Sequence, residues 1–421
     1  MLQNNKYLHL VNYNTLLLWD IKRYFATQLL SQFSVVRLGD YIREESAKYK
    51  INDPTQKYGI LGVNNQIGIF DAYEEEGSKI KQKYKKMQVG WIAYNPYRIN
   101  VGSIGIRKST HNYEYISPAY VVFSCKNELL PEFLFLLMKT ELFNKIIREN
   151  TTGSVRQNLN YSVLSNLQIP LPSLTEQKNI VDAYNYAISQ AENYTQEADR
   201  IEKDILTYLN TILGINTCEK EQHGYGTLFF KNLSQVSRWD VWNTPVSKFS
   251  NKYPLKSLEQ IIIMQSGKFL PTKYQEKGIY NVYGGNGLTG THSAYCFSGK
   301  RIVIGRVGEY CGNVHIIEGN YWITDNALKV DKITQDVTWE YLEIALKALN
   351  INQYKSISAQ PSISQTKILQ LQIPLPPLDI QNEIVEHIAA LRTEQKELRQ
   401  KALLLRQQAT KQFEQTIFSV I

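Results

Sequence analysis

The pattern of apolar and polar residues divides the chain into two β-rich stretches, each followed by a long amphipathic helix. Short apolar and aromatic runs bounded by Gly, Asn and Pro are typical of β-strands. Each stretch also predicts a shorter helix before its long one, over residues 131–149 and 338–350. The predicted strand runs are 58–64, 90–97 and 119–125 in the first stretch and 279–285, 301–308 and 313–319 in the second.

The two long helices carry apolar residues at steps of four and three, which is the heptad pattern of a coiled coil. The 33 residues from 180 to 212 would form a rod of about 50 Å. Because both helices share one register, we expect them to pair with each other; the alternative is that each packs only on its own domain. The predicted seam residues are Ile180, Tyr184, Ala187, Ile201 and Ile205 in the first helix and Ile384, Ile388, Leu391, Leu398 and Leu405 in the second.

Capping signals mark the ends of these helices. Ser173 and Glu176 form a capping box before the first helix, and Gly214 is suited to its C-terminal end. Thr175 and Asp379 occupy equivalent positions that are compatible with an N-cap.

An internal repeat underlies the pattern. The sequence LQIPLP occurs at 167–172 and again at 371–376, an offset of 204, and the ten residues from each final proline also agree in type. Six identical residues in a row, followed by helices in the same register, indicate a duplicated segment.

A second pair of matching segments lies upstream. Trp19-Asp20 matches Trp239-Asp240 at an offset of 220, and residues 35–42 align with residues 254–261 at the same offset. The offsets differ by 16, so the second copy has the shorter middle. We therefore predict an α+β fold with an internal pseudo-two-fold repeat.

Four segments follow from the repeat. We expect a β-rich domain over residues 1–172, a spacer helix over 173–213, a second β-rich domain over 214–376 that opens with a short linker, and a second spacer helix over 377–421.

The charge of the chain is unevenly distributed. The chain has 421 residues, a net charge of +8 and a pI near 9.0, which permits a polyanionic partner such as nucleic acid. Residues 173–213 carry −4 and residues 378–421 carry zero, so removing both from +8 leaves +12 for the remainder. We expect the positive potential on the β-rich domains.

Cysteine usage and the N-terminal sequence point to the cytoplasm. The four cysteines are scattered and do not form a disulfide framework. The first residues lack the pattern of a signal peptide, and the most apolar stretch, Leu129 to Met138, is interrupted by Pro131 and too short to cross a membrane.

Two motifs suggest chemistry but are outweighed by structural interpretations. Residues 285–290 satisfy GxGxxG, yet the following residues do not predict the helix that a dinucleotide site needs. Asn95-Pro96-Tyr97 resembles the NPPY element of adenine methyltransferases but lacks a proline, and a turn is expected instead. Together with the absence of a P-loop or a nucleophile elbow, this predicts a chain without catalytic residues.

A metal site remains an open alternative. His292, Cys296, Cys311 and His315 have a spacing that would suit a tetrahedral zinc site, although the first copy has no counterpart. We expect no metal.

Several motifs together indicate a known family. They are the Trp-Asp that opens each copy, YNVYGGNGLTGTHSAY (280–295), RIVIGRVGEYCGNV (301–314), ITDNALKV (323–330), AQPSIS (359–364) and the endings IPLPSLTEQ and IPLPPLDIQ. On these residues the chain resembles, across nearly its whole length, the specificity subunit of type I restriction-modification systems. Leu18 stands where the second copy has Arg238, and RQNLNY at 156–161 replaces QPSISQ, so the first copy departs further from the pattern.

The resemblance implies that each β-rich domain is a target-recognition domain that reads one half of a bipartite site in double-stranded DNA. The long helices would form an antiparallel spacer that sets the gap and docks two methyltransferase subunits, which carry S-adenosylmethionine. Restriction subunits would complete the complex, while this chain would bind no cofactor.

DNA contacts are expected from Arg and Lys on guanine edges and phosphates, and from Asn, Gln, Ser and Thr on adenine edges or the backbone. Two other classes of protein stay open: an enzyme that contains its own recognition domains, and a non-catalytic coiled-coil adaptor with protein-binding β domains. The candidate DNA-binding residues are Lys79, Lys81, Lys83, Lys85, Lys86, Arg98, Arg107 and Arg156 in the first domain and Lys268, Asn286, Thr289, Arg306, Gln360 and Ser362 in the second.

Overall fold

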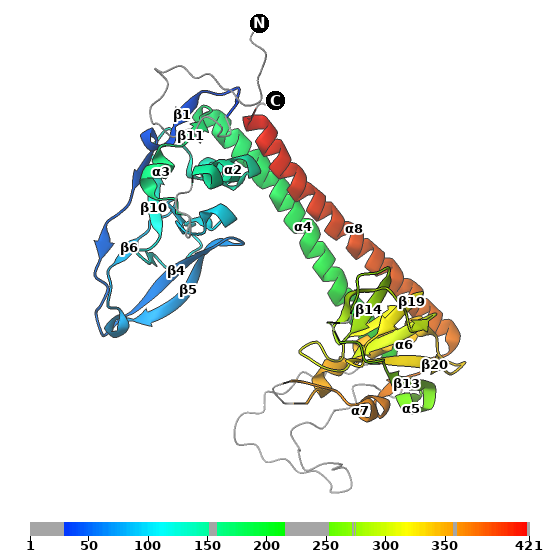
Figure 1. The fold of residues 1–421 in the computed structure, drawn as a ribbon. Helices are drawn as coiled ribbons and strands as arrows, with labels where there is room; N and C mark the ends of the chain where they lie inside the picture. The colour runs from blue at the N-terminus through cyan, green and yellow to red at the C-terminus, as the bar shows by residue number, and fades with distance from the viewer. Residues whose placement is uncertain are drawn as a thin grey trace. The chain divides into compact units, whose positions relative to one another are not determined.

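The computed structural model describes residues 29–150, 158–214, 252–271, 273, 275–356 and 360–418. Arg156 and the two Trp-Asp pairs lie outside these residues. The described chain forms two compact units, one up to Asn193 together with the residues from Lys401, and the other Tyr194–Gln400 (Figure 1). We call the β-rich parts of these units the first module (29–173) and the second module (252–377).

The first module is a sequence of short strands followed by short helices. Its helices are α1 (Pro131–Lys139), α2 (Glu141–Asn150) and α3 (Tyr161–Ser165). Its strands are β1 (Val35–Arg37), β2 (Ile42–Glu44), β3 (Lys48–Tyr49), β4 (Lys57–Asn64), β5 (Gly68–Glu76), β6 (Tyr84–Lys86), β7 (Ile92–Tyr94), β8 (Ile104–Ile106), β9 (Tyr115–Ile116), β10 (Val121–Cys125) and β11 (Gln168–Pro170).

The second module has a similar order of elements. Its helices are α5 (Leu258–Ile261), α6 (Trp339–Ala348) and α7 (Gln365–Leu369). Its strands are β12 (Leu255–Ser257), β13 (Ile262–Ser266), β14 (Tyr280–Gly284), β15 (Gly287–His292), β16 (Phe297–Ser298), β17 (Arg301–Gly305), β18 (Val314–Ile317), β19 (Asn320–Ile323), β20 (Ala327–Ile333) and β21 (Gln372–Pro374).

Two sheets recur in both modules with corresponding strand orders. One sheet runs β2-β10-β7-β8 in the first module and β13-β20-β17-β18 in the second. The other runs β6-β9-β4-β5 and β16-β19-β14-β15, and its central pair is parallel in each case. The first module adds β3 beside β6 and has a longer β4–β5 hairpin, which lengthens the middle of the first copy as the sequence offsets predict.

The sequence anchors of the repeat pair with each other in space. In the first module β1 pairs antiparallel with β11, so that Val36 faces Ile169. In the second β12 pairs with β21, so that Lys256 faces Ile373. Val36 and Lys256 are related by the offset of 220, and Ile169 and Ile373 by the offset of 204. The first and last strands of each module therefore form the same two-stranded ribbon.

A buried glutamine joins each module to its long helix. The Gln177 Nε2 donates to the carbonyl oxygens of Glu128 and Pro172, and its Oε1 accepts from the Leu130 amide at 2.8 Å. Gln381, at the equivalent position, makes the same set of bonds. Both side chains are fully buried. The glutamine of the IPLP-x-L-x-x-Q ending thus ties the start of the long helix to the loop before α1 or α6.

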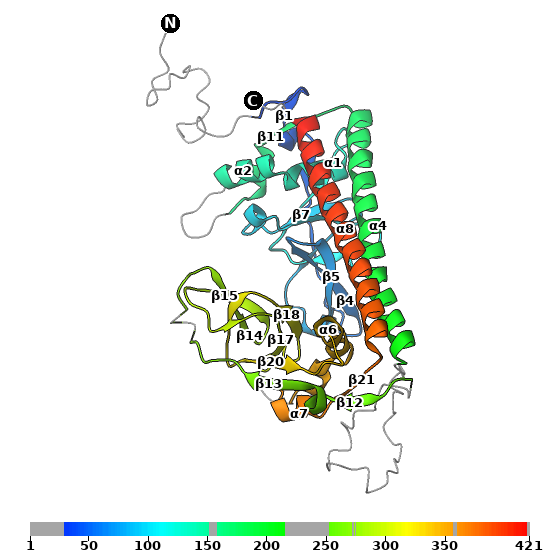
Figure 2. The ribbon, with the colours of Figure 1, turned by 90° about the vertical axis from the view of Figure 1, so that its right-hand side faces the viewer.

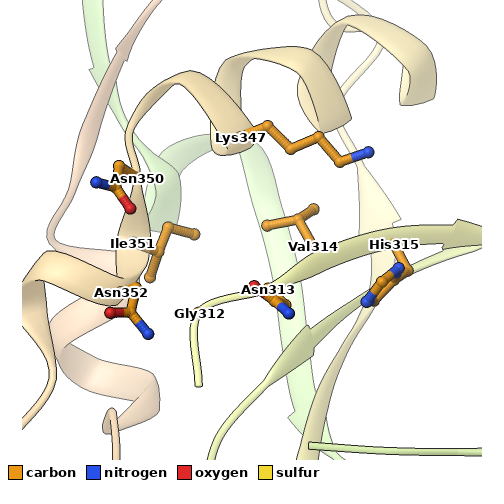
Figure 3. Close-up of a pocket in the computed structure, with 8 residues that line it drawn as sticks. All are labelled: Gly312, Asn313, Val314, His315, Lys347, Asn350, Ile351 and Asn352. Atoms are coloured by element: carbon orange, nitrogen blue, oxygen red, sulfur yellow. The ribbon is translucent and has the colours of Figure 1, made fainter. Parts of the chain in front are cut away.

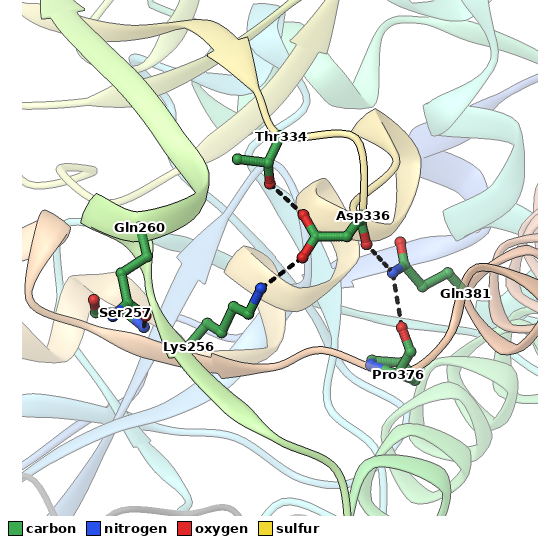
Figure 4. Close-up of polar contacts among 7 residues, drawn as sticks. All are labelled: Lys256, Ser257, Gln260, Thr334, Asp336, Pro376 and Gln381. Atoms are coloured by element: carbon green, nitrogen blue, oxygen red, sulfur yellow. Dashed lines mark hydrogen bonds and ion pairs between the residues drawn. The ribbon is translucent and has the colours of Figure 1, made fainter.

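Figure 4 shows this junction in the second module, where Gln381 donates to the carbonyl oxygens of Asp336 and Pro376 at 2.8 and 2.9 Å. Asp336 in turn accepts from Lys256 of β12 at 2.6 Å, and this hydrogen bond holds the pKa of its carboxyl below the usual range. The ribbon, the loop and the helix are therefore connected by one hydrogen-bonded group.

The predicted strands are all confirmed, and so is the predicted helix over 338–350, which is α6 with Thr338 as its N-cap. The single helix predicted over 131–149 is wrong, because the chain forms α1 and α2 with a break at Thr140. Thr140 is extended, with ψ of 152°, and its hydroxyl accepts from the Phe143 amide at 3.2 Å. The break lets Phe133 and Phe143 both enter the core of the first module.

The long helices α4 (Leu174–Leu213) and α8 (Leu378–Ile417) are 40 residues each, or about 60 Å at the rise of an α-helix. Ser173 and Glu176 form the predicted capping box, and Gly214 ends α4 with φ of 63°. Thr175 and Asp379 are wrong as N-caps, because each lies one residue inside its helix, in the first turn.

The helices pack together antiparallel (Figure 2). In one unit Tyr184 of α4 contacts Phe413 of α8, with ring centroids 5.9 Å apart, and in the other Tyr208 contacts His387 at 4.2 Å. The alternative that each helix packs only on its own domain is therefore wrong. Of the predicted seam residues, Ile201, Ile205, Ile384, Ile388 and Leu398 are buried, and Ile180, Tyr184, Ala187, Leu391 and Leu405 are half-buried.

Within the part of the chain that the structure describes, none of the helices combines the length and the apolar character needed to cross a membrane.

Candidate nucleic-acid interface

At one end of the second module three loops come together. The β14–β15 turn abuts the turn after β17, since a Cβ on Gly285 would lie 2.5 Å from the Val307 carbonyl oxygen. The turn after β17 bonds the segment that enters α7, where the Gly308 amide donates to the Pro361 carbonyl at 2.8 Å. We call residues 284–288, 306–310 and 360–363 the loop end of the second module.

The first module brings the corresponding loops together. The Ser103 hydroxyl, on the segment before β8, donates to the Val63 carbonyl of β4 at 3.2 Å, and the Asn95 amide donates to the Ser103 carbonyl. The Leu159 amide, before α3, donates to the Pro96 carbonyl at 3.1 Å. The loop end of the first module comprises residues 64–68, 95–98 and 158–160.

Arg306, Asn286 and Ser362 are candidate residues that the structure gathers at the loop end of the second module. The Arg306 guanidinium donates to the Ser266 hydroxyl at 3.1 Å and is partly exposed. Asn286 is exposed at the hairpin turn, where its Oδ1 accepts from Asn313 at 3.3 Å. Amide and guanidinium groups held in this way match the hydrogen-bonding groups on base edges.

The other candidates of the second module lie on the same loops or beside them. Thr289 is exposed on β15 and its hydroxyl donates to the Val282 carbonyl at 3.0 Å. Lys268 is exposed after β13, with its ammonium 5.6 Å from the centre of the Phe297 ring. Gln360 is exposed before α7.

The lysine run of the first module lies away from its loop end. Strand β5 begins at the hairpin turn and ends at Glu76, so Lys79 follows the far end of the hairpin and forms an ion pair with Glu76 at 3.1 Å. Lys81 and Lys83 are exposed ahead of β6, and Lys86 forms an ion pair with Glu114 at 2.8 Å.

Lys85 and Arg107 use their charged groups inside the first module. Lys85 is 5% exposed and donates to the Tyr120 carbonyl at 2.9 Å, and burial lowers the pKa of its ammonium. The Arg107 guanidinium donates to the carbonyls of Met87 and Tyr113 at 2.7 and 2.9 Å. These two residues therefore stabilise loops rather than present charge to solvent.

Arg98 differs from them, because it is exposed in the turn after β7 and belongs to the loop end of the first module. Asn95, Pro96 and Tyr97 form the expected turn there, with the Tyr97 amide donating to Asn95 Oδ1 at 3.0 Å.

Sequence reasoning missed Asn65 and Gln66, which are exposed at the β4–β5 turn. This turn is the counterpart of the β14–β15 turn that carries Asn286. The repeat contained the signal, since aligning the two hairpins places VNNQIG opposite the glycine-rich GGNGL segment.

The four residues of the possible zinc site have different surroundings. Cys311 is buried in the core of the second module, while His292 accepts from the Glu276 amide at 3.2 Å and packs edge-on against Trp322. Among the described residues no three His, Cys, Asp or Glu side chains are grouped as metal ligands. Residues 285–290, the GxGxxG segment, form the β14–β15 turn and continue as strand.

His315 instead lines a cavity of about 340 Å³ between the start of β18 and the end of α6 (Figure 3). Asn313, Lys347 and Asn352 also line it together with Val314 and Ile351, so its walls are partly polar and partly apolar. Burial, with a smaller effect of Lys347, lowers the pKa of His315.

Comparison with solved structures supports the architecture. A chain in a structure described as addressing complex assembly and conformational transition of the type I R-M system aligns with 93% of this chain and 97% of its own length. The TM-score is 0.59 and the sequence identity 16%, so the likeness concerns the fold.

Two curated relatives are similar over part of the sequence. The specificity subunit of the type I restriction enzyme EcoprrI from Escherichia coli is 31% identical over 131 residues, which are 30% of this chain and 32% of that protein. The MjaIX specificity subunit from Methanocaldococcus jannaschii is 24% identical over 149 residues, 35% of this chain and 31% of that protein. The matches thus span about a third of each relative.

The family model of the type I restriction modification DNA specificity domain matches residues 32–203 and again residues 250–404. The two matches correspond to the two copies of the repeat and together cover most of the sequence. The chain therefore belongs to the family of type I restriction-modification DNA specificity domains.

Proposed function

We propose that this chain is the non-catalytic DNA specificity subunit of a type I restriction-modification complex. Each module reads one half of a bipartite, gapped site in double-stranded DNA, and α4 and α8 set the gap. The observation that carries the proposal is the recurrence of the loop end: in two copies of one fold, the same three loops meet and expose amide, hydroxyl and guanidinium groups.

The chemistry of these groups suits the major groove. Asn and Gln side chains bond the N6 and N7 positions of adenine, and Arg bonds O6 and N7 of guanine. Asn65, Gln66 and Arg98 supply such groups in the first module, and Asn286 and Arg306 in the second. Gln360, Ser362 and Thr289 extend the second set.

Exposed lysines are assigned to the phosphate backbone, where charge rather than geometry decides affinity. Lys81, Lys83 and Lys268 suit this role best, because they are exposed and no ion pair involves them among the described residues. Lys79 and Lys86 also remain candidates for phosphate contacts. Their surface ion pairs are weak, so each lysine can exchange its carboxylate partner for a phosphate. Arg156, outside the described residues, is retained, whereas Lys85 and Arg107 are left out.

The proposed complex also contains partner subunits. Two methyltransferase subunits, which carry S-adenosylmethionine, dock on α4 and α8, and restriction subunits join them. In this arrangement the present chain needs no cofactor, and its helices present protein-binding rather than DNA-binding surfaces.

The test is selection of bound sequences from a randomised duplex pool by the full-length chain, alone and with its methyltransferase subunits. We expect two short words at a fixed separation, with affinity that falls steeply as salt rises because phosphate contacts release counterions. An adaptor that binds only protein would select no sequence, and methylation or cleavage by the purified chain alone would indicate an enzyme instead.

A further inference from the structure

Each loop end exposes one large aliphatic side chain at its hairpin turn. Ile67 follows Gln66 at the β4–β5 turn and is 66% exposed, and Leu288 is the second residue of the return strand of the β14–β15 hairpin and is 60% exposed. Single exposed apolar residues are common on protein surfaces. Here, however, each copy of the repeat places one directly beside the glycine that begins the return strand, Gly68 or Gly287, and next to amide side chains.

Both turns are held in one conformation by local hydrogen bonds. In the first module Asn64 Oδ1 accepts from the amides of Gln66 and Ile67 at 3.0 and 2.8 Å. In the second Gly287 adopts φ of 86°, which favours glycine, and the Thr289 hydroxyl bonds across the hairpin to Val282. The aliphatic side chains therefore project from ordered turns, so that a partner can bind them with little loss of conformational entropy.

We infer that Ile67 and Leu288 each contact the C5 methyl group of a thymine in the half-site of their module. The inference rests on the proposed function. Among the groups that base pairs present in the major groove, the thymine methyl is the one apolar group, whereas the neighbouring amides match the donors and acceptors. An aliphatic side chain between polar readers adds a preference for thymine that hydrogen bonds alone do not provide.

The test uses the full-length chain and its selected site, in which each thymine of a half-site is replaced singly by uracil. This replacement removes only the methyl group. For the second module we expect one position at which uracil weakens binding about fourfold, the effect of withholding one methyl-sized group from burial. L288A should bind the thymine and uracil duplexes with equal affinity. That affinity should equal the affinity of the wild-type chain for the uracil duplex.

A matched control is I263A, because Ile263 is 53% exposed on β13 of the same module but lies outside the loop end. For the first module the corresponding pair is I67A and V89A, since Val89 is 56% exposed before β7, at the end of that strand away from Arg98. Both controls should keep the full uracil effect.

The inference is overturned if no thymine responds to uracil, if the response survives in L288A and I67A, or if the half-sites contain no thymine. Each of these results leaves the DNA reader intact, because a gapped site has then been selected. Failure to select any sequence overturns the proposed function itself, and the inference with it.

Discussion

Arg306 lies in the loop end of the second module, where Ser266 orients its guanidinium from the end of β13. A guanidinium held by one hydrogen bond keeps its remaining donors for a guanine edge. We expect R306A to weaken binding to the selected site about 10- to 100-fold, with a smaller loss on non-specific duplex. R306K keeps the charge and should relax the sequence preference at one position.

The matched control is K332A, because Lys332 is exposed near the far end of β20. Competition titrations with specific and random duplexes at one salt concentration measure both affinities. Equal losses on both duplexes in R306A would assign Arg306 to the phosphate backbone.

His315 gives the second module a dependence of stability on pH. Burial lowers its pKa in the folded chain below the ordinary value of about 6.5 in the unfolded chain. The unfolded state therefore takes up the proton first, so the contribution to stability is complete above pH 6.5 and is lost as the pH falls toward the folded pKa.

We expect H315N to reduce the loss of stability between pH 8 and pH 5.5, measured by urea unfolding of the variant and of the wild-type chain. An identical acid loss in H315N and in the wild-type chain would show that other groups cause it.

Lys85 shows where sequence reasoning at single residues reaches its limit. The alternation of Lys79, Lys81, Lys83 and Lys85 suggests one solvated basic edge, but β6 begins only at Tyr84. Lys85 then points inward and its ammonium finds the Tyr120 carbonyl, a partner 35 residues away. A contact of this kind depends on the tertiary fold, and the local pattern of charges does not contain it.

At the scale of elements, the junction between module and long helix depends on Gln381. Its fully buried side-chain amide accepts a hydrogen bond from the Thr338 backbone amide and donates to the carbonyl oxygens of Asp336 and Pro376. Removing the amide leaves these backbone groups without a partner, at a cost of about 1–3 kcal/mol for a buried group.

Q381A should therefore lower the free energy of unfolding by about 2 kcal/mol. N382A, an exposed change in the next residue of the same helix, should stay within about 0.5 kcal/mol of the wild-type value. Chemical denaturation measures the free energy of unfolding of both variants. Equal values for Q381A and N382A would show that the Gln381 hydrogen bonds do not stabilise the junction.

The seam of the long helices contains one buried polar residue. Gln395 of α8 is 9% exposed and donates to the Ala198 carbonyl and to Glu202 Oε2 of α4, at 2.9 and 3.0 Å. Polar residues in a seam fix the register of a coiled coil at some cost in stability.

We expect Q395L to maintain or raise the melting temperature but to admit more than one helix register. Double electron–electron resonance between spin labels on α4 and α8 would then show a broader distance distribution than in the wild-type chain. A single narrow distribution in Q395L would show that the apolar residues alone determine the register.

Most of the elements could be predicted from the sequence because their signals are local. Strand runs, the heptads of α4 and α8, the Ser173–Glu176 box and the Gly214 end all follow from short-range patterns. The break at Thr140 could not, because a hydroxyl that caps α2 interrupts an otherwise continuous apolar pattern. Competition between a local cap and helix periodicity is settled by how Phe133 and Phe143 pack.

At the scale of the whole molecule, the duplication was visible in the sequence, and the matching sheet orders of the two modules are its consequence. Only some of the residues at the loop ends could be predicted from the sequence. Arg98, Asn286, Arg306 and Ser362 were identified by residue type, whereas Asn65 was missed. The meeting of loops from distant parts of the chain arises from strand pairing, which single-sequence patterns do not specify.

In the proposed function, the two modules read two words at a separation set by the long helices. Deleting one heptad from α4 and the seven facing residues from α8 shortens both helices by about 10 Å, the length of about three base pairs. Selection from a randomised duplex pool should return the same two words, with the gap between them shorter by about three base pairs. Recovery of the original gap from the shortened chain would contradict the claim.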